Sequence, residues 1–369
     1  MAHRAAGGQR GDCGRQPRRA DRCQRQGRRV EAERRRGEES GGGGGRIRIA
    51  VLEDIHDAFH KELAIHRLQQ RAEVVFYTDP TTDANRKQRM AGVDAIITLR
   101  ERTRLDAAFF ADAPDLKYVS QTGRADPHID RAAATAAGVL VAEGAGGFSY
   151  STVELTFALI MSIMRRIPQS DALLRQGQWV VPYGLTMQGK TLGIVGMGRI
   201  GAMVSKIAVE FGMTVLAWSR NMTPERAAAA KATAASLEDV MAKPDVVSVH
   251  LALNDGTRGL VNRRLLGSMR PDAFFVNTAR ADTTDEAALI ELLQQHRIAG
   301  ATLDVFTEEP LPPNHPLLAL DNVVLTPHIG WPADASYARF ADGAVANLEA
   351  WLDGKLENVV NPDAVKNQK

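Results

Sequence analysis

The sequence has very little cysteine and no long hydrophobic run. Both cysteines, Cys13 and Cys23, lie among the first 45 of the 369 residues. The rest of the chain is therefore expected to hold neither a disulfide framework nor a cysteine-bound zinc site. No apolar segment reaches the roughly 18 to 20 residues that cross a bilayer, and the arginine-rich N-terminus lacks the apolar stretch of a secretory signal. These absences favour a cytoplasmic protein that uses side chains other than thiols.

Positive charge is concentrated at the N-terminus. Residues 1–45 contain 12 arginines and 6 acidic residues and end in five glycines. Their net charge of +6 leaves −4 for residues 46–369, because the whole chain carries +2. A segment with so few apolar residues is expected to be disordered. Nucleic-acid binding by its arginines is the less favoured interpretation. The others are a plain extension, a cloning remnant, or upstream DNA translated from a start codon placed too early.

The remaining chain predicts two domains, because it is longer than one hydrophobic core usually fills. In its first part, short β-rich runs alternate with helical patterns, which predicts a parallel sheet. The expected strands are Ile47–Leu52, Glu73–Tyr77, Ala95–Thr98, Lys117–Ser120 and Val139–Val141. A second alternating block begins at Thr191 and contains six further strand-like runs: TLGIVG, MTVLAW, DVVSVH, AFFVN, AGATLDV and NVVLTPH.

Helices are predicted around these strands. A buried helix is expected from Ser149 to about Arg166, since this run is apolar on nearly every side and Pro168 follows it. Another is expected over Ala333–Leu352, ending near Asp353-Gly354. Helical spacing also marks three further segments: Arg199–Phe211, Glu286–Gln295 and one that Ser236 and Asp239 would cap.

The glycine turn Gly196-Met197-Gly198-Arg199-Ile200-Gly201 follows an apolar strand and opens a helical pattern. In this context GxGxxG is typical of a dinucleotide-binding turn rather than a structural one. The first glycine permits the tight turn, the second lets the pyrophosphate approach the backbone, and the third lets helix and strand pack closely. The N-terminus of the helix favours the phosphates.

The choice between NAD and NADP depends on the end of the next strand. NAD-preferring sites usually have an acidic residue there for the ribose 2′-hydroxyl, whereas this chain has Ser219-Arg220-Asn221. The missing carboxylate removes a repulsion against a 2′-phosphate and Arg220 could pair with one, so NADP is slightly favoured. The other interpretation leaves Arg220 in solvent and Ser219 on the ribose.

Three polar residues follow later strands: Arg280 in NTARAD, Glu309 in DVFTEEP and His328 in TPHIG. Singly, they could be a surface ion pair, a turn residue and a loop histidine. Together, beside a dinucleotide turn, they fit the reduction of a 2-keto acid. A guanidinium can hold the carboxylate and carbonyl oxygens with fixed geometry. A histidine can donate the proton, and a neighbouring carboxylate favours its protonated form.

These motifs, in this order, resemble the D-isomer-specific 2-hydroxyacid dehydrogenase family over about residues 46–358. The resemblance implies that Arg280 binds the substrate, that His328 exchanges the proton and that Glu309 pairs with His328. It places Asp304 beside the nicotinamide and Thr122, Gly123 and Arg124 in a substrate-binding loop. It also implies a homodimer formed through the cofactor domains. With the residues argued above, the expected cofactor site comprises Gly196, Gly198, Arg199, Ile200, Gly201, Ser219, Arg220 and Asp304.

Several positions depart from the family's pattern. Ala281 follows the arginine where glycine is frequent, and Ala252 replaces a frequent proline. Trp331-Pro332 stands after the histidine motif where small residues are usual, so the substrate pocket is expected to differ and no particular acid is implied. Arg100 is a further candidate for the substrate site, and Arg102 could also face it, although a solvated charge run explains both equally well.

The expected fold is α/β with two Rossmann-like domains. A discontinuous, flavodoxin-like substrate domain would comprise 46–147 and 330–369, and an inserted dinucleotide-binding domain would comprise 148–329, because the glycine turn comes late in the chain. The expected function is NAD(P)-dependent interconversion of a small D-2-hydroxy acid and its 2-keto acid, without a metal ion. A nicotinamide-sensing, corepressor-like regulator is the main alternative, and an enzyme oxidising formate or phosphite is a weaker one.

Overall fold

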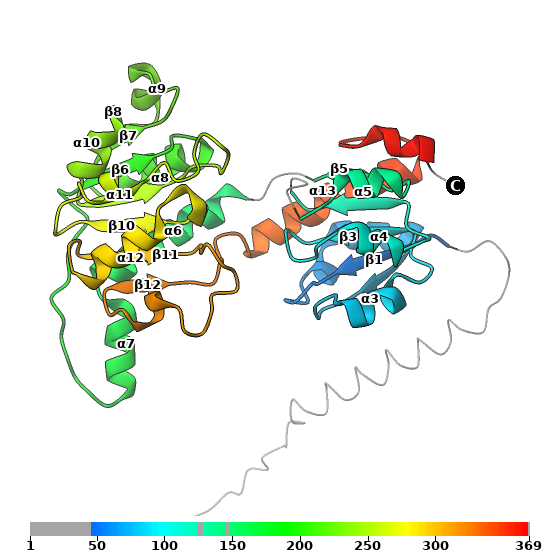
Figure 1. Cartoon of the computed structure of the whole chain (residues 1–369), viewed down its shortest axis with the longest axis horizontal. Helices are drawn as coiled ribbons and strands as arrows, with labels where there is room; N and C mark the ends of the chain where they lie inside the picture. Colours follow the sequence, from blue (N-terminus) through cyan, green and yellow to red (C-terminus); the bar gives the residue numbers. More distant parts are fainter. Residues whose placement is uncertain (1–45, 124–127, 145–147, 368–369) are drawn as a thin grey trace, which may run out of the picture. The chain divides into compact units, whose positions relative to one another are not determined.

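The structure, a computed structural model, describes residues 46–123, 128–144 and 148–367 (Figure 1). From Ile47 onwards these residues belong to one compact unit that contains two parallel β-sheets. No helix among them is both long and apolar enough to cross a membrane. Arg124, a predicted substrate-binding residue, lies outside the described residues, as does the arginine-rich segment 1–45.

The first sheet has five parallel strands in the order β2-β1-β3-β4-β5, which is the flavodoxin-like order. Its strands are β1 (Arg48–Leu52), β2 (Glu73–Phe76), β3 (Ala95–Thr98), β4 (Tyr118–Gln121) and β5 (Leu140–Glu143). Its helices are η1 (Phe59–Lys61), α2 (Leu63–Arg71), α3 (Asp83–Met90), α4 (Ala107–Ala111) and α5 (Arg131–Ala136). The five predicted strands are confirmed with ends displaced by at most a residue or two, because each contains adjacent apolar residues. Four of them are largely buried, whereas the edge strand β2 is exposed or half-buried.

The C-terminal helix α13 (Asp334–Leu352) completes the core of this first sheet. Its apolar residues, among them Phe340 and Leu348, share a buried cluster with β1 and β3. The Ser120 hydroxyl in β4 donates to the Ala344 carbonyl at 2.9 Å. The helix ends before Gly354, whose φ of +74° suits glycine, and the short helix η4 (Pro362–Asn367) follows. Residues distant in the sequence therefore build one core.

The second sheet has seven parallel strands in the order β12-β11-β10-β9-β6-β7-β8, which contains the dinucleotide-binding order. Its strands are β6 (Thr191–Val195), β7 (Thr214–Trp218), β8 (Thr233–Ala234), β9 (Val246–Val249), β10 (Phe274–Asn277), β11 (Gly300–Leu303) and β12 (Val323–Leu325). Its helices include α8 (Arg199–Glu210), α9 (Pro224–Ala229), α10 (Leu237–Ala242), α11 (Arg263–Leu266) and α12 (Glu286–Gln294), with η3 (Pro316–Ala319) before β12. The sequence did not predict β8, because its two residues are exposed and carry no apolar pattern.

The buried helix predicted from Ser149 to about Arg166 is present as α6 (Ser149–Met164), and a second helix that was not predicted follows it. Helix α6 ends two residues before Arg166, which adopts a left-handed conformation with φ +54°. Pro168 lies in the first turn of α7 (Ile167–Arg175), where its missing N–H removes no helical hydrogen bond. The proline therefore starts a helix that the sequence analysis missed.

Candidate active site

The glycine turn joins β6 to α8 and has the geometry that a dinucleotide requires. Gly196 has φ +106°, and a Cβ there would lie 2.7 Å from the His250 carbonyl oxygen. A Cβ at Gly201 would overlap the Gly196 carbonyl oxygen, whereas a Cβ at Gly198 would have nothing within 4 Å. The first and third positions thus require glycine for packing, and the second leaves the backbone accessible. Arg199 and Ile200 form the first turn of α8, so their N–H groups belong to the helix end that attracts phosphate.

The residues after β7 line a surface hollow. The Arg220 Nη2 donates to the Gly256 carbonyl at 2.7 Å, so this exposed guanidinium is held against the loop after β9. The hollow is lined by Trp218, Ser219, Arg220, Met222, Ala234, Ala235 and Ser236. None of these residues is acidic, so nothing in the lining would repel a 2′-phosphate.

Arg226 in α9 connects the glycine turn to the segment after β7, and the sequence analysis did not identify it. Its Nη2 donates to the Met197 carbonyl at 2.9 Å and its Nη1 to the Asn221 carbonyl at 3.2 Å. No local motif indicates such a contact, because the turn and α9 are about 30 residues apart and meet only in the fold.

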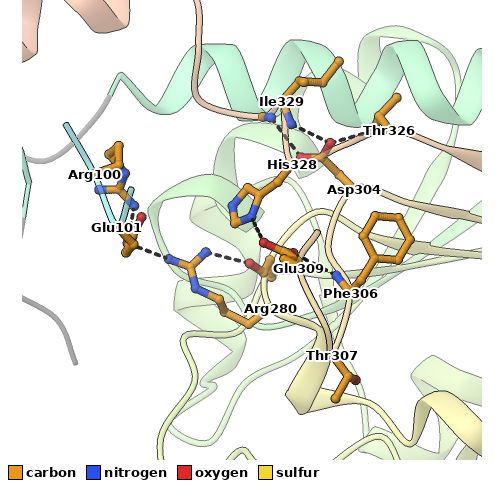
Figure 2. Close-up of polar contacts among 12 residues, drawn as sticks. Arg100, Glu101, Arg280, Asp304, Phe306, Thr307, Glu309, Thr326, His328 and Ile329 are labelled. Carbon is orange, nitrogen blue, oxygen red and sulfur yellow. Dashed lines mark hydrogen bonds and ion pairs between the residues drawn. The ribbon is translucent and has the colours of Figure 1, made fainter. Parts of the chain in front are cut away.

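Glu309 and His328 form a hydrogen-bonded pair at the end of the second sheet (Figure 2). The His328 Nδ1 and the Glu309 Oε2 are 2.7 Å apart. The Phe306 backbone N–H donates to the other carboxylate oxygen at 2.9 Å. Burial raises the pKa of Glu309, but the hydrogen bonds from His328 and Phe306 and the positive charge of Arg280 outweigh it, so the net pKa lies below the usual value. Glu309 is therefore held ionised beside the imidazole.

Asp304, which follows β11, fixes the loop that carries His328. The hydroxyl of Thr326 and the N–H of Ile329 donate to Asp304 Oδ1 at 2.6 and 2.8 Å. The Gly330 N–H donates to Oδ2 at 2.8 Å, and His328 between these donors has φ +55°. Burial is the largest influence and raises the pKa of Asp304 despite these hydrogen bonds. Both carboxylate oxygens thus serve the histidine loop, a role that the sequence did not suggest.

Arg280 lies between β10 and the short helix η2 (Ala281–Thr283). The Asn277 Nδ2 and the Thr283 hydroxyl both donate to the Arg280 carbonyl, at 3.1 and 2.7 Å. The Arg280 side chain is 41% exposed. Its Nη1 donates to the Ala279 carbonyl at 2.8 Å, and its Nη2 lies 3.9 Å from Glu101 Oε1 (Figure 2). The backbone is therefore held firmly while the charged group remains accessible.

The predicted substrate-binding residues of the first sheet lie beside β3 and β4. Arg100 is 15% exposed at its side chain and pairs with Glu101 at 3.0 Å. The N–H and the hydroxyl of Thr122 both donate to the Thr98 carbonyl, at 3.0 and 2.9 Å. Thr122 therefore uses these groups within the sheet, and Gly123, with φ +90°, is the next residue towards the predicted loop.

Arg102 and Trp331 pack on each other. The Arg102 guanidinium carbon lies 4.9 Å from the centre of the Trp331 ring, and its Nη1 donates to the Glu53 carbonyl at 2.8 Å. Trp331 also packs against Tyr337 and Phe340 of α13. The tryptophan after the histidine motif is thus anchored in the core of the first sheet, and Arg102 is held against it.

Parallel sheets of these two orders and a glycine turn between β6 and α8 are typical of nucleotide-dependent oxidoreductases. Residues 157–330 match the family model described as "D-isomer specific 2-hydroxyacid dehydrogenase, NAD binding domain". The chain belongs to the D-isomer-specific 2-hydroxyacid dehydrogenase family of oxidoreductases. The predicted family and fold class are thereby confirmed.

Similar proteins carry more than one name. The chain is 40% identical over 283 residues to a glyoxylate reductase of Aeropyrum pernix, covering 74% of this chain and 84% of that protein. It is 38% identical over 274 residues to a D-3-phosphoglycerate dehydrogenase of Mycobacterium bovis, covering 74% of this chain but only 51% of that protein. An oxidoreductase structure from Ralstonia solanacearum, provisionally named D-3-phosphoglycerate dehydrogenase, matches with a TM-score of 0.80 and 38% identity over 86% of this chain and 98% of that one.

Proposed function

We propose that this enzyme reduces a small 2-keto acid to the D-2-hydroxy acid with a nicotinamide cofactor, as the name of its glyoxylate reductase relative suggests. The observation that carries the proposal is the 2.7 Å contact between His328 Nδ1 and Glu309 Oε2. The hydrogen bond to Glu309 fixes the orientation of the imidazole ring. This pairing leaves the Nε2 of His328 as the nitrogen that donates a proton to the substrate oxygen.

Arg280 is the proposed anchor for the substrate carboxylate and carbonyl oxygens. Its exposed guanidinium can present two parallel N–H groups to two oxygens. A nicotinamide cofactor bound at the glycine turn supplies the hydride. The hydrogen bonds from Asn277 and Thr283 to the Arg280 backbone carbonyl limit the movement of Arg280. A fixed Arg280 favours one orientation of the substrate carbonyl.

In the proposed domain organisation, residues 46–147 and 330–369 form the substrate domain, and residues 148–329 form the cofactor-binding domain. Asp304 and the glycine turn belong to the second part, and Thr122, Gly123, Arg124 and Arg100 to the first. The order of the second sheet and the open approach at Gly198 support the assignment of the cofactor. The shared core of α13 and the first sheet supports that of the substrate part.

NADP is the slightly favoured cofactor, because Arg220 lies at the hollow after β7 and no lining residue is acidic. Replacing Arg220 with alanine should lower kcat/KM for NADPH more than for NADH, by about 10-fold for the loss of one charged contact to a phosphate. Measuring both cofactors with wild type and variant tests the assignment. An equal loss of kcat/KM for both cofactors would mean that Arg220 stabilises the loop after β9 and does not bind the 2′-phosphate.

A homodimer formed through the cofactor-binding part is also proposed. All residues of α7 are at least partly exposed, and the segment after it presents Trp179 and Tyr183 at 84% and 88% exposure. Large exposed aromatic side chains are typical of interfaces. The double variant Trp179→Ser with Tyr183→Ser should lower the molar mass measured by light scattering from that of a dimer to that of a monomer. A wild-type monomer would contradict the proposal.

The reaction is tested by following the absorbance of reduced nicotinamide with the purified full chain. NADH and NADPH are each offered with a panel of 2-keto acids that includes glyoxylate and hydroxypyruvate. The proposal expects consumption of at least one cofactor that depends on the keto acid. Binding of cofactor without consumption across the whole panel would contradict it and favour a nicotinamide-sensing role.

A further inference from the structure

Glu101 faces two arginines of the proposed active site. Its Oε1 lies 3.0 Å from Arg100 Nη2 and 3.9 Å from Arg280 Nη2 (Figure 2). One carboxylate oxygen therefore lies between the proposed substrate anchor and the arginine at the end of β3. The Glu101 side chain is 37% exposed, so a substrate bound to Arg280 would come close to its charge.

Arg100 is fixed beside Glu101 by several contacts. Its backbone N–H donates to the Thr122 hydroxyl at 2.9 Å, and its guanidinium carbon lies 5.8 Å from the centre of the Phe340 ring. A Cβ at Gly123 would lie 2.5 Å from Arg100 Nη1, so the guanidinium lies directly against the predicted substrate loop. Its Nε is buried without a hydrogen-bond partner in the described part of the chain. The Arg100 guanidinium is therefore held beside Glu101 and Gly123.

The charges of Arg100, Arg280 and Glu101 sum to one net positive charge, which matches a single anionic group. Arg100 and Arg280 alone would offer two positive charges, which would suit an acid with a second anionic group beyond the reacting carbon. Glu101 offsets one of these charges. A second anion on the substrate would also meet the like charge of Glu101, and such repulsion is an effective means of rejecting a competitor.

We propose that Glu101 is a specificity-determining residue that restricts this enzyme to 2-keto acids with a single negative charge. It acts by occupying the cationic position at Arg100 that a second substrate anion would otherwise use. This inference rests on the proposed function, because it takes Arg280 as the anchor of the substrate carboxylate. The substrate class is a 2-keto acid whose side chain is uncharged.

The test compares two keto acids with five carbons each. 2-Ketovalerate ends in a methyl group, and 2-ketoglutarate ends in a second carboxylate. The kcat/KM ratio of 2-ketoglutarate to 2-ketovalerate should rise about 10-fold or more in Glu101→Gln, with a smaller rise at high salt. Glu101→Asp keeps the charge and should keep the wild-type ratio. Glu73→Gln is the matched control, since it removes an acidic partner of Arg48 at the far strand β2.

Binding of the two corresponding products, D-2-hydroxyvalerate and D-2-hydroxyglutarate, is measured in parallel by calorimetry. Oxidised cofactor is left out, so that neither product can react. If the wild type reduces no 2-keto acid, the proposed function fails, and the ratio of the two binding constants still decides the role of Glu101. Equal ratios in wild type and Glu101→Gln would overturn the inference. So would the absence of binding by both ligands, or a rise in Glu73→Gln as large as that in Glu101→Gln.

Discussion

Asp304→Asn is the substitution that most directly tests how the histidine loop is held. The variant keeps the shape of the side chain but replaces one acceptor oxygen with an NH2 donor. Three donors face the carboxylate: the Thr326 hydroxyl and the Ile329 N–H at Oδ1, and the Gly330 N–H at Oδ2. Whichever way the amide is oriented, at least one of these donors faces another donor.

The magnitude follows from the burial of this group. Asp304 is 1% exposed, and a buried donor left unsatisfied costs about 1–3 kcal/mol. Burial also raises the pKa of Asp304, so removing its charge lowers the desolvation cost and offsets part of the loss in the free energy of unfolding. Local opening of the loop that carries His328 is therefore a better measure than the stability of the whole protein. A loss of about 1–3 kcal/mol in the opening of the loop corresponds to amide exchange faster by roughly 5- to 150-fold.

The assay is hydrogen–deuterium exchange of a peptide that covers residues 326–330, together with kcat and the Kd of the cofactor. Faster exchange and a kcat lower by about 10- to 100-fold are expected, because a displaced His328 misaligns the proton donor. Asp334→Asn is the control, since that exposed carboxylate at the start of α13 accepts from the neighbouring Ala335 N–H. Wild-type exchange with a weakened cofactor Kd would refute this role and favour the predicted position beside the nicotinamide.

Two further predictions concern Glu309 and His250. Glu309→Gln removes the charged carboxylate that lies 2.7 Å from His328 Nδ1, so kcat for keto-acid reduction should fall by about 10-fold or more because the proton donor loses the partner that orients it; an unchanged kcat would remove Glu309 from this role. Burial lowers the pKa of His250 from 6.5 to about 4, so the unfolded state binds a proton that the folded state does not. Stability should therefore decrease as pH falls through this window, by at most about 3 kcal/mol. His250→Gln should flatten the pH dependence of the urea midpoint, and an equal slope in variant and wild type would contradict the assignment.

The parts of the fold that the sequence predicted are those with a local signal. The strands β1 to β5 each contain adjacent apolar residues, and the glycine turn lies between one strand and the next helix, where Gly201 packs against the Gly196 carbonyl within one βα unit. The helix cap at Ser236 was also predicted, and its hydroxyl accepts from the Asp239 N–H at 3.1 Å. Local patterns of this kind can be read without knowledge of the rest of the chain.

The parts that escaped prediction depend on contacts between distant segments. The Thr152 hydroxyl in α6 donates to the Gly330 carbonyl at 2.9 Å, across 178 residues. Arg226 reaches the glycine turn, and Asn277 holds the Arg280 carbonyl. Nothing in the neighbouring sequence distinguishes these residues from surface arginines or strand-end amides. The helix α7 escaped prediction for a related reason, since Pro168 is equally compatible with a helix that stops and one that starts.

His328 is the proposed proton donor in the reduction of a 2-keto acid. The direct measurement compares wild type with His328→Gln for glyoxylate reduction, with cofactor binding followed in parallel by tryptophan fluorescence. We expect kcat to fall by at least about 100-fold while the cofactor Kd is unchanged. Wild-type turnover in His328→Gln would contradict this role.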